Sequence, residues 1–178
     1  MEVFEAIAKR HSYRGPFKNQ QIPQDELRRI VQAGIQAPSG RNRQTTTFII
    51  VDDTNLLAAI RELHVTSKAM QQAQAYIVCL IDKHPEVTSE THSFYIEDYA
   101  AAVENMFLAV TALGYATVWI DGWLRSEGRA EKIGKLLGVP EEKVVRVILP
   151  IGIPAEVHQQ KEKKSFEERA WLNRYGAN

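Results

Sequence analysis

Apolar residues recur at spacings of three and four along much of the chain, which is the period of a helix that buries one face. The clearest pattern runs from Asp98 to Leu113 and ends before Gly114, a residue that suits a helix C-cap. Periodicity and capping signals predict further helices at Val3 to Lys9, Pro23 to Gln36, from Thr54 onward, Glu127 to Leu137, and a short C-terminal helix that opens with the capping box Ser165-Phe-Glu-Glu168.

Short apolar runs rich in β-branched residues indicate strands. The run from Tyr76 to Ile81 is apolar at every position, which is typical of a strand covered on both faces of its sheet. Three further runs predict strands at Thr47 to Val51, Tyr115 to Ile120 and Val144 to Ile151. Strands that alternate with helices favour a layered α/β or α+β fold. A chain of 178 residues without a repeat or long linker is expected to form one domain, residues 1–178.

The charge balance narrows the possible partners. Lys plus Arg and Asp plus Glu both total 22, so the net charge is zero with neutral His. A balanced chain argues against a dedicated nucleic-acid binder and against a polybasic membrane protein. The longest uncharged stretch, Asn105 to Ile120, is shorter than the roughly 20 apolar residues that span a bilayer. Because the chain opens without a signal-peptide pattern, a cytoplasmic protein is expected.

The single cysteine, Cys79, excludes an internal disulfide and a cysteine-rich zinc site. It lies inside an apolar run, so we expect a buried, unreactive thiol. No G-x-G-x-x-G, P-loop or G-x-S-x-G motif occurs, and the histidines show no metal-ligand spacing. The sequence therefore predicts neither a metal site nor any of these three common site types.

The first candidate binding segment is Arg10-His-Ser-Tyr-Arg14, in a stretch that glycine and proline keep extended or looped. Side chains alternate along an extended segment, so Arg10, Ser12 and Arg14 would share one side. Two guanidinium groups and a hydroxyl on one side suit a phosphate or a carboxylate. The alternative is a solvated basic loop, in which His11 serves only in packing or hydrogen bonding.

The second candidate is the loop Ala37-Pro-Ser-Gly-Arg-Asn-Arg-Gln44, which follows the second predicted helix. Pro38 and Gly40 favour a tight turn with exposed backbone groups. The side chains that could read the edge of a heterocycle are Ser39, Asn42 and Gln44. The alternative is a loop that simply ends the helix, where Ser and Asn are common.

Three further segments carry weaker signals. Glu104 and Asn105 lie within an apolar helical pattern, so we expect them to satisfy backbone or partner-subunit groups. Gly122 follows the strand end Trp119-Ile-Asp121 and would let the backbone approach a ligand. The late run Lys161-Glu-Lys-Lys164 could close on an anion, and a solvated charged run is the alternative.

The order of these motifs is informative. The chain contains, in sequence, Arg-His-Ser-x-Arg, Ala-Pro-Ser-Gly-x-Asn-x-Gln, Glu-Asp-x-Ala-Ala-Ala-x-Glu-Asn, Gly-Tyr-Ala-Thr-x-Trp-Ile, Leu-Pro-Ile-Gly-x-Pro and a lysine cluster. In this order, and over nearly the whole chain, they resemble the nitroreductase family of flavin enzymes. The resemblance implies an α+β, nitroreductase-like fold with a central, mostly antiparallel β-sheet flanked by helices. It also implies an intertwined homodimer with C-terminal exchange and FMN at the dimer interface.

The resemblance further implies which residues hold FMN. They are Arg10, His11, Ser12, Arg14, Pro38, Ser39, Gly40, Asn42, Asp121, Gly122, Lys161 and Lys163. The N-terminal group would hold the phosphate, ribityl chain and pyrimidine edge, with His11 contributing through its backbone. The loop group would come from the other subunit, and the third pair would lie beside the ring with one N–H directed at flavin N5. The two lysines would grip the phosphate, although the family commonly has Arg where this chain has Lys163.

The resemblance implies no dedicated catalytic side chain, because the flavin carries the hydride transfer. NADH or NADPH would reduce FMN and leave, and a small-molecule acceptor such as a nitroaromatic or a quinone would then be reduced in ping-pong order. The segment from Glu86 to Tyr95 is shorter than the family's excursion over the flavin, which bears on acceptor size. The alternatives are flavin-cleaving oxygen chemistry or reductive dehalogenation on the same fold, a flavin-binding module without turnover, and a non-flavin anion-binding domain.

Both ends of the chain fit this expectation. Residues 1–45 carry a net charge of +4 and residues 161–178 one of +2, against −6 for residues 46–160. The segments that the resemblance brings together around a phosphate are therefore the cationic ones. The C-terminal tail also contains apolar residues that would cover a second subunit, with packing on their own chain as the alternative: Phe166, Trp171, Leu172 and Tyr175.

Overall fold

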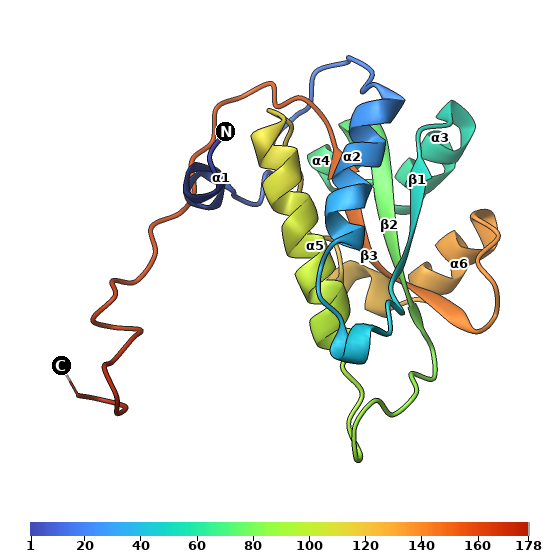
Figure 1. The fold of residues 1–178 in the computed structure, drawn as a ribbon. Helices are drawn as coiled ribbons and strands as arrows, with labels where there is room; N and C mark the ends of the chain where they lie inside the picture. Colours follow the sequence, from blue (N-terminus) through green and yellow to red (C-terminus); the bar gives the residue numbers. More distant parts are fainter. Residues whose placement is uncertain (178) are drawn as a thin grey trace.

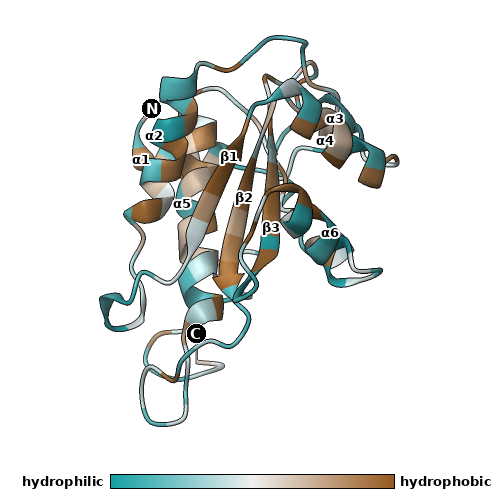
Figure 2. Cartoon of the chain, turned by 90° about the vertical axis from the view of Figure 1, so that its right-hand side faces the viewer, coloured by the Kyte–Doolittle hydropathy of each residue, from teal (hydrophilic) through white to brown (hydrophobic). Residues whose placement is uncertain are grey.

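The structure is a computed structural model that describes residues 1–177. Its helices are α1 (Val3–Lys9), α2 (Gln24–Ile35), α3 (Thr54–Leu63), α4 (Lys68–Gln72), α5 (Tyr95–Ala112) and α6 (Arg129–Leu136), with 3-10 turns η1 (Gly40–Asn42) and η2 (Gly122–Arg125). Its strands are β1 (Thr47–Val51), β2 (Ala75–Asp82) and β3 (Lys143–Ile151). Figure 2 shows three layers edge-on, with α1, α2 and α5 on one side of the sheet and α3, α4 and α6 on the other.

The sheet has the order β1-β2-β3, and both neighbouring pairs are antiparallel. Residues of β2 alternate between the two helical layers, with Ile77, Cys79 and Ile81 toward α2 and α5, and Tyr76, Val78 and Leu80 in the opposite core. The prediction of a strand covered on both faces is confirmed, and so is a helix-flanked antiparallel sheet. Burial raises the pKa of the Cys79 thiol to about 12, with the Arg146 charge acting in the opposite direction. The cysteine is therefore buried and unreactive, as predicted.

The packing of α2 on α5 depends on a small residue. A Cβ at Gly34 would lie 2.9 Å from Cγ of Met106, so the two helices approach closely there. Asn105 Nδ2 donates a hydrogen bond to the Ala33 carbonyl at 3.1 Å, which satisfies a backbone group as predicted.

Several helix ends follow their sequence signals. The Asp53 side chain accepts hydrogen bonds from two backbone N–H groups at the start of α3, and the Ser67 side chain accepts one at the start of α4. Gly114 follows α5 with φ +83°, the left-handed conformation expected just beyond a helix C-terminus. α5 begins at Tyr95, one turn earlier than the apolar periodicity predicts.

The prediction of a regular strand from Tyr115 to Ile120 is wrong. The segment forms isolated bridges to three different partners: Ala116 with Gly152, Thr117 with Ser12, and Ile120 with Ile148. The bridges of Ala116 and Ile120 lie in one antiparallel register with the end of β3, and Thr117 bridges Ser12 on the opposite edge. That register puts Val118 opposite Pro150, which has no N–H to donate, so the ladder is interrupted and no regular strand forms.

The predicted C-terminal helix is also wrong. The Glu168 side chain accepts a hydrogen bond from the Ser165 N–H at 3.0 Å, which is one half of a capping box, but only a single turn follows. Short helices need tertiary packing, and this segment is exposed. In Figure 1 the tail passes α1 and then runs away from the body of the molecule. Among residues 1–177, no helix has both the length and the apolar character needed to cross a membrane.

Candidate functional site

The segment Arg10–Arg14 is anchored by Tyr13, whose side chain is fully buried. The Tyr13 N–H donates to the Thr117 carbonyl at 2.8 Å, and the Tyr13 hydroxyl donates to a nearby backbone carbonyl at 2.5 Å. Because side chains alternate along extended backbone, Ser12 and Arg14 are exposed. The segment therefore presents a hydroxyl and a guanidinium outward from a fixed backbone.

Arg10 lies on the same segment but is held against α5. Its Nε is 3.2 Å from Oε1 of Glu104, and its guanidinium carbon is 5.7 Å from the centre of the Phe107 ring. Glu104 thus pairs with a side chain of its own chain, where the sequence predicted a backbone or partner-subunit group. The Arg10 side chain is only 20% exposed, so its position is well defined by these contacts.

The C-terminal segment returns to this region. Gln160 Nε2 donates a hydrogen bond to the Arg10 carbonyl at 2.5 Å, and Lys161 follows directly. Lys161 and Lys163 are exposed, and within residues 1–177 neither forms an ion pair. The fold therefore returns Lys161 to the neighbourhood of Arg10, while Lys163 lies further along the tail.

Two buried polar atoms near this segment have no hydrogen-bond partner in the described part of the chain. One is Nε2 of His11, whose Nδ1 already contacts the Lys9 carbonyl at 2.9 Å. The other is Oγ1 of Thr117, which is 2% exposed and bridges to Ser12 through its backbone. Buried polar groups are nearly always paired, so two such atoms on adjoining segments show that hydrogen-bonding capacity is left unused here.

The loop around Pro38–Asn42 is held in an unusual conformation. Three residues that are not glycine have left-handed backbone: Arg41, Asn42 and Gln44. The Gly40 N–H donates to Oδ1 of Asp98 at 2.7 Å, and a Cβ at Gly40 would lie 2.7 Å from the Phe94 ring. Ser39 Oγ accepts the Gln44 N–H at 3.0 Å. The turn is therefore fixed by side chains, as functional loops often are.

Within one chain this loop does not meet the Arg10 segment. The loop contacts α5 at Asp98, whereas Arg10 contacts it at Phe107. These positions are two and a half helical turns apart, which places them on opposite faces and about 13 Å apart along the axis. Figure 1 shows α1 on one side of α5 and the loop, drawn in cyan, near its lower end on the other side.

Asp121 and Gly122 form a third group. The Asp121 carboxylate accepts two hydrogen bonds from Arg125, both at 2.6 Å, and lies 3.5 Å from Nη1 of Arg146. Burial acts to raise the pKa of Asp121, but the two guanidinium groups outweigh it and hold the pKa below its usual value. No atom lies within 4 Å of the position that a Cβ at Gly122 would take, so the backbone faces open space.

A row of aromatic side chains along α5 connects this third group with the Arg10 segment. The Phe107 ring centre is 6.4 Å from that of Trp119, which is 6.1 Å from that of Tyr99. The Tyr99 hydroxyl accepts hydrogen bonds from Arg146, and Arg146 contacts Asp121. The structure therefore brings the Arg10–Arg14 segment and Asp121–Gly122 onto the same face of α5, about 12 Å apart along its axis.

The sequence reading missed Arg146 and Tyr99. Arg146 is the one charged residue inside the apolar stretch Val144–Ile151, and a lone charge in a buried strand was the signal that could have identified it. Tyr99 falls on the apolar stripe of its helix, and nothing in the sequence distinguishes its hydroxyl from a solvated one.

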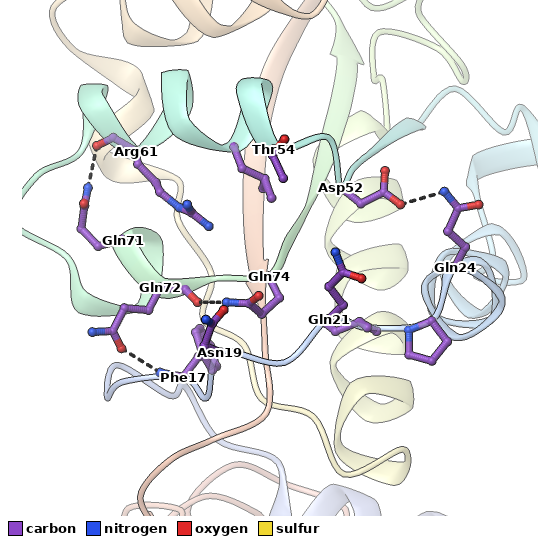
Figure 3. Close-up of a pocket in the computed structure, with 13 residues that line it drawn as sticks. Phe17, Asn19, Gln21, Gln24, Asp52, Thr54, Arg61, Gln71, Gln72 and Gln74 are labelled. Carbon is purple, nitrogen blue, oxygen red and sulfur yellow. Dashed lines mark hydrogen bonds between the residues drawn. The ribbon is translucent and has the colours of Figure 1, made fainter.

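A cavity of about 920 Å³ lies elsewhere in the fold. Figure 3 shows it between the segment Phe17–Gln24, the end of β1, α3 and α4, with polar side chains that mostly hold nearby backbone or one another. For example, Gln24 Nε2 donates to Asp52 at 2.8 Å. None of the predicted FMN residues lines this cavity.

The comparisons agree with the motif order. A profile described as the nitroreductase family matches residues 7–84 and 62–153. A relative from Archaeoglobus fulgidus, provisionally named NADH dehydrogenase/NAD(P)H nitroreductase, is 32% identical over 94% of this chain and 90% of its own. A solved structure from Bacteroides thetaiotaomicron with the same provisional name is 25% identical, covers 96% of each chain and has a TM-score of 0.81.

A further structure, described as an FMN-dependent nitroreductase from Clostridium difficile, is 24% identical, with a TM-score of 0.80 over 97% of this chain and 99% of that one. At that identity the likeness shows the fold alone. The family match and the named relative together confirm the prediction of an NAD(P)H-dependent oxidoreductase: the chain belongs to the nitroreductase family.

Proposed function

We propose that the protein is an FMN-dependent oxidoreductase that uses NADH or NADPH to reduce a small organic acceptor, such as a nitroaromatic or a quinone. The observation that carries the proposal is the bridge between Ser12 and Thr117. It joins the cationic N-terminal segment to the stretch that leads to Gly122.

The proposed FMN-binding residues fit the chemistry of each part of the cofactor. Guanidinium, ammonium and hydroxyl groups suit a phosphate and a pyrimidine edge, and this chain would supply Arg10, His11, Ser12, Arg14, Lys161 and Lys163. Thr117 Oγ1 and His11 Nε2 lack partners among the described residues, and a small local movement would let them pair with a ligand. The structure named from Clostridium difficile as FMN-dependent supports the same cofactor.

Bound FMN would supply the redox chemistry, because its N5 can accept a hydride from NADH or NADPH and return it to the acceptor in ping-pong order. The residues of this chain bind and orient. The Gly122 N–H has no acceptor within the described residues, and the surrounding space would allow it to donate to a ring nitrogen. The cations of the N-terminal segment would stabilise negative charge in the site.

A homodimer would complete this site. In one chain, α5 separates the Pro38–Asn42 loop from the Arg10 segment, so the loop of a second subunit would have to supply Pro38, Ser39 and Gly40, with Asn42 supporting their turn. Exposed apolar side chains on α1 fit such an interface, since Val3 is 57% exposed, Phe4 82% and Ile7 48%.

C-terminal exchange would hold the two subunits together. In the tail, Phe166 is 66% exposed, Leu172 72% and Tyr175 89%, and the segment runs away from its own chain (Figure 1). Within residues 1–177, no strand pairs with the outer edge of β1. The apolar tail has no surface of its own chain to pack against, and the edge of β1 has no strand to pair with. Because each could satisfy the other across a dimer, we assign the tail to the partner subunit.

The visible absorption spectrum of the purified protein tests the proposal. A yellow protein that bleaches on anaerobic addition of NADH or NADPH is expected. A colourless protein that FMN cannot reconstitute would contradict flavin binding, and a yellow protein that neither donor reduces would contradict the redox function. Turnover with a nitroaromatic, a quinone and oxygen, each tested alone, would identify the acceptor class, and loss of flavin absorbance under oxygen would indicate flavin cleavage instead.

A further inference from the structure

One charged side chain interrupts the apolar core of the sheet. Arg146 lies on β3, where the neighbouring residues Val145 and Val147 are buried. Its own side chain is 19% exposed. A guanidinium so placed must be satisfied by fixed partners, because an unpaired charge in this position would strongly destabilise the fold.

The partners of Arg146 come from two other parts of the chain. Its Nε and Nη2 each donate to the Tyr99 hydroxyl at 3.1 Å, and its Nη1 lies 3.5 Å from Oδ1 of Asp121. The guanidinium carbon is also 5.3 Å from the Tyr99 ring centre. Arg146 therefore connects the sheet, the first turns of α5 and the residue that precedes Gly122.

Asp121 is fixed by its backbone as well as by its side chain. Its carbonyl accepts the Leu124 N–H at 2.8 Å, which closes the turn η2. The two guanidinium groups that pair with Asp121 differ in whether they hold it in place relative to the core. Arg125 lies on η2 itself and is 54% exposed, so it moves with the turn, whereas Arg146 belongs to the sheet. Of these two guanidinium groups, only that of Arg146 fixes Asp121 relative to the core.

We propose that Arg146 is a positioning residue that fixes the Asp121–Gly122 peptide, so that the Gly122 N–H is already in place for a bound flavin ring. This inference rests on the proposed function. Tyr99 orients the guanidinium of Arg146, and Arg146 orients the carboxylate of Asp121. Preorganised N–H donors contribute most where they need not rearrange during the reaction, and a link to the sheet provides that rigidity.

Hydrogen–deuterium exchange of the FMN-free protein tests the mechanical part of this inference. In Arg146→Gln, the amides of residues 120–125 are expected to exchange at least tenfold faster than in the wild type, and Tyr99→Phe should give a smaller acceleration. Lys143→Gln is the matched control, because Lys143 lies on the same strand, is 21% exposed and also forms an ion pair, with Asp82 at 2.7 Å. Equal exchange in Arg146→Gln and Lys143→Gln would overturn the proposal.

The loaded enzyme tests the functional part. Arg146→Gln should keep its FMN dissociation constant within about threefold of the wild-type value, because the phosphate contacts are untouched. It should shift the flavin absorption bands and lower kcat at least tenfold with little change in KM, and Arg146→Lys should recover part of the loss. A lower melting temperature with an unchanged spectrum and kcat would mean a purely structural role and would overturn the proposal.

The two proposals fail in different ways. A colourless wild-type protein would contradict the proposed function, whatever the exchange data show. A yellow, reducible wild-type protein with an unchanged Arg146→Gln variant would contradict only the positioning role. A loss of FMN affinity above a hundredfold in Arg146→Gln would replace positioning with direct cofactor binding, and so would also overturn the inference.

Discussion

The Asp98 carboxylate accepts a hydrogen bond from the Gly40 N–H at 2.7 Å and thereby joins two segments that are 58 residues apart in the sequence. Asp98 is 7% exposed, in the first turn of α5. A Cβ at Gly40 would overlap the Phe94 ring, so this close approach requires glycine. The buried carboxylate therefore sets the position of the whole Pro38–Asn42 loop.

Replacing this carboxylate should release the loop. Asp98→Ala leaves a partly buried N–H without an acceptor, and we expect the free energy of unfolding to fall by about 1–3 kcal/mol. Asp98→Asn retains an amide oxygen that can accept the same hydrogen bond, so its loss should be smaller. Urea unfolding of the two variants gives the comparison. Equal stability of Asp98→Ala and the wild type would show that the hydrogen bond does not hold the loop.

This contact also shows what the sequence could and could not predict. Apolar patterns located α2, α5, α6 and all three strands, because each places apolar residues against the core. They also located α1, of which only Ala6 is buried. The five-residue helix Lys68–Gln72 is too short to show a period and was missed. From the sequence, Asp98 is placed only at the start of a helix, where a carboxylate suits the positive end of the helix dipole. Its actual partner, Gly40, is determined by the packing of the folded chain, which local sequence does not encode.

Alanine substitutions at two glycines distinguish an effect on folding stability from an effect on FMN binding. At Gly152 a Cβ would overlap the Phe17 ring, so Gly152→Ala should lower the free energy of unfolding by about 1–3 kcal/mol. At Gly122 nothing lies within 4 Å, so Gly122→Ala should change stability by less than about 0.5 kcal/mol. If flavin occupies that space, the same variant should weaken FMN binding about tenfold or more. Unchanged FMN affinity would place the ring elsewhere.

Arg14 should matter for cofactor binding and not for folding. It is exposed and forms no ion pair in the part of the chain that the structure describes. Loss of a hydrogen bond to a charged group costs about 1.5–3 kcal/mol, so Arg14→Ala should weaken FMN binding roughly 10- to 100-fold with little change in melting temperature. Lys132→Ala removes one positive charge from α6, beyond the sheet, and is the control. Identical flavin content and turnover in Arg14→Ala would refute this placement of the site.

His64 should make the fold sensitive to acid. Its ring stacks on Trp123 at 4.2 Å, and burial, assisted by the charge of Arg129, lowers its pKa below the usual value. The unfolded chain therefore takes up a proton first as pH falls, so stability should decrease below about pH 6.5 until the folded-state pKa is passed. His64→Phe keeps the stacking but cannot titrate, and its melting temperature should drop less between pH 7.5 and pH 5. Parallel pH profiles for variant and wild type would exclude this cause.

The site could be predicted only in pieces. Motif order selects the segments around Arg10, Pro38 and Asp121 as candidates, because each combines unusual polar residues with a turn or a strand end, and their binding of FMN stays a prediction. It could not show that α5 separates two of these segments within one chain. It also gave no hint that Arg146, a residue in an apolar strand, connects the third segment to the core. Such relationships depend on helix faces and strand register, which appear only in the folded structure.

Removal of the C-terminal tail should convert the proposed dimer into a monomer. If residues 165–178 cover a partner, a chain that ends at Lys164 loses Phe166, Leu172 and Tyr175 and should become monomeric by light scattering. Its FMN content should fall at the same time, because the loop of the second subunit would be lost from each site. Val157→Ser is the control, since Val157 is 95% exposed but precedes the Gln160 contact with Arg10. A truncated protein that remains dimeric and yellow would contradict C-terminal exchange, whereas a monomer that retains FMN would contradict the proposal that two subunits form the site.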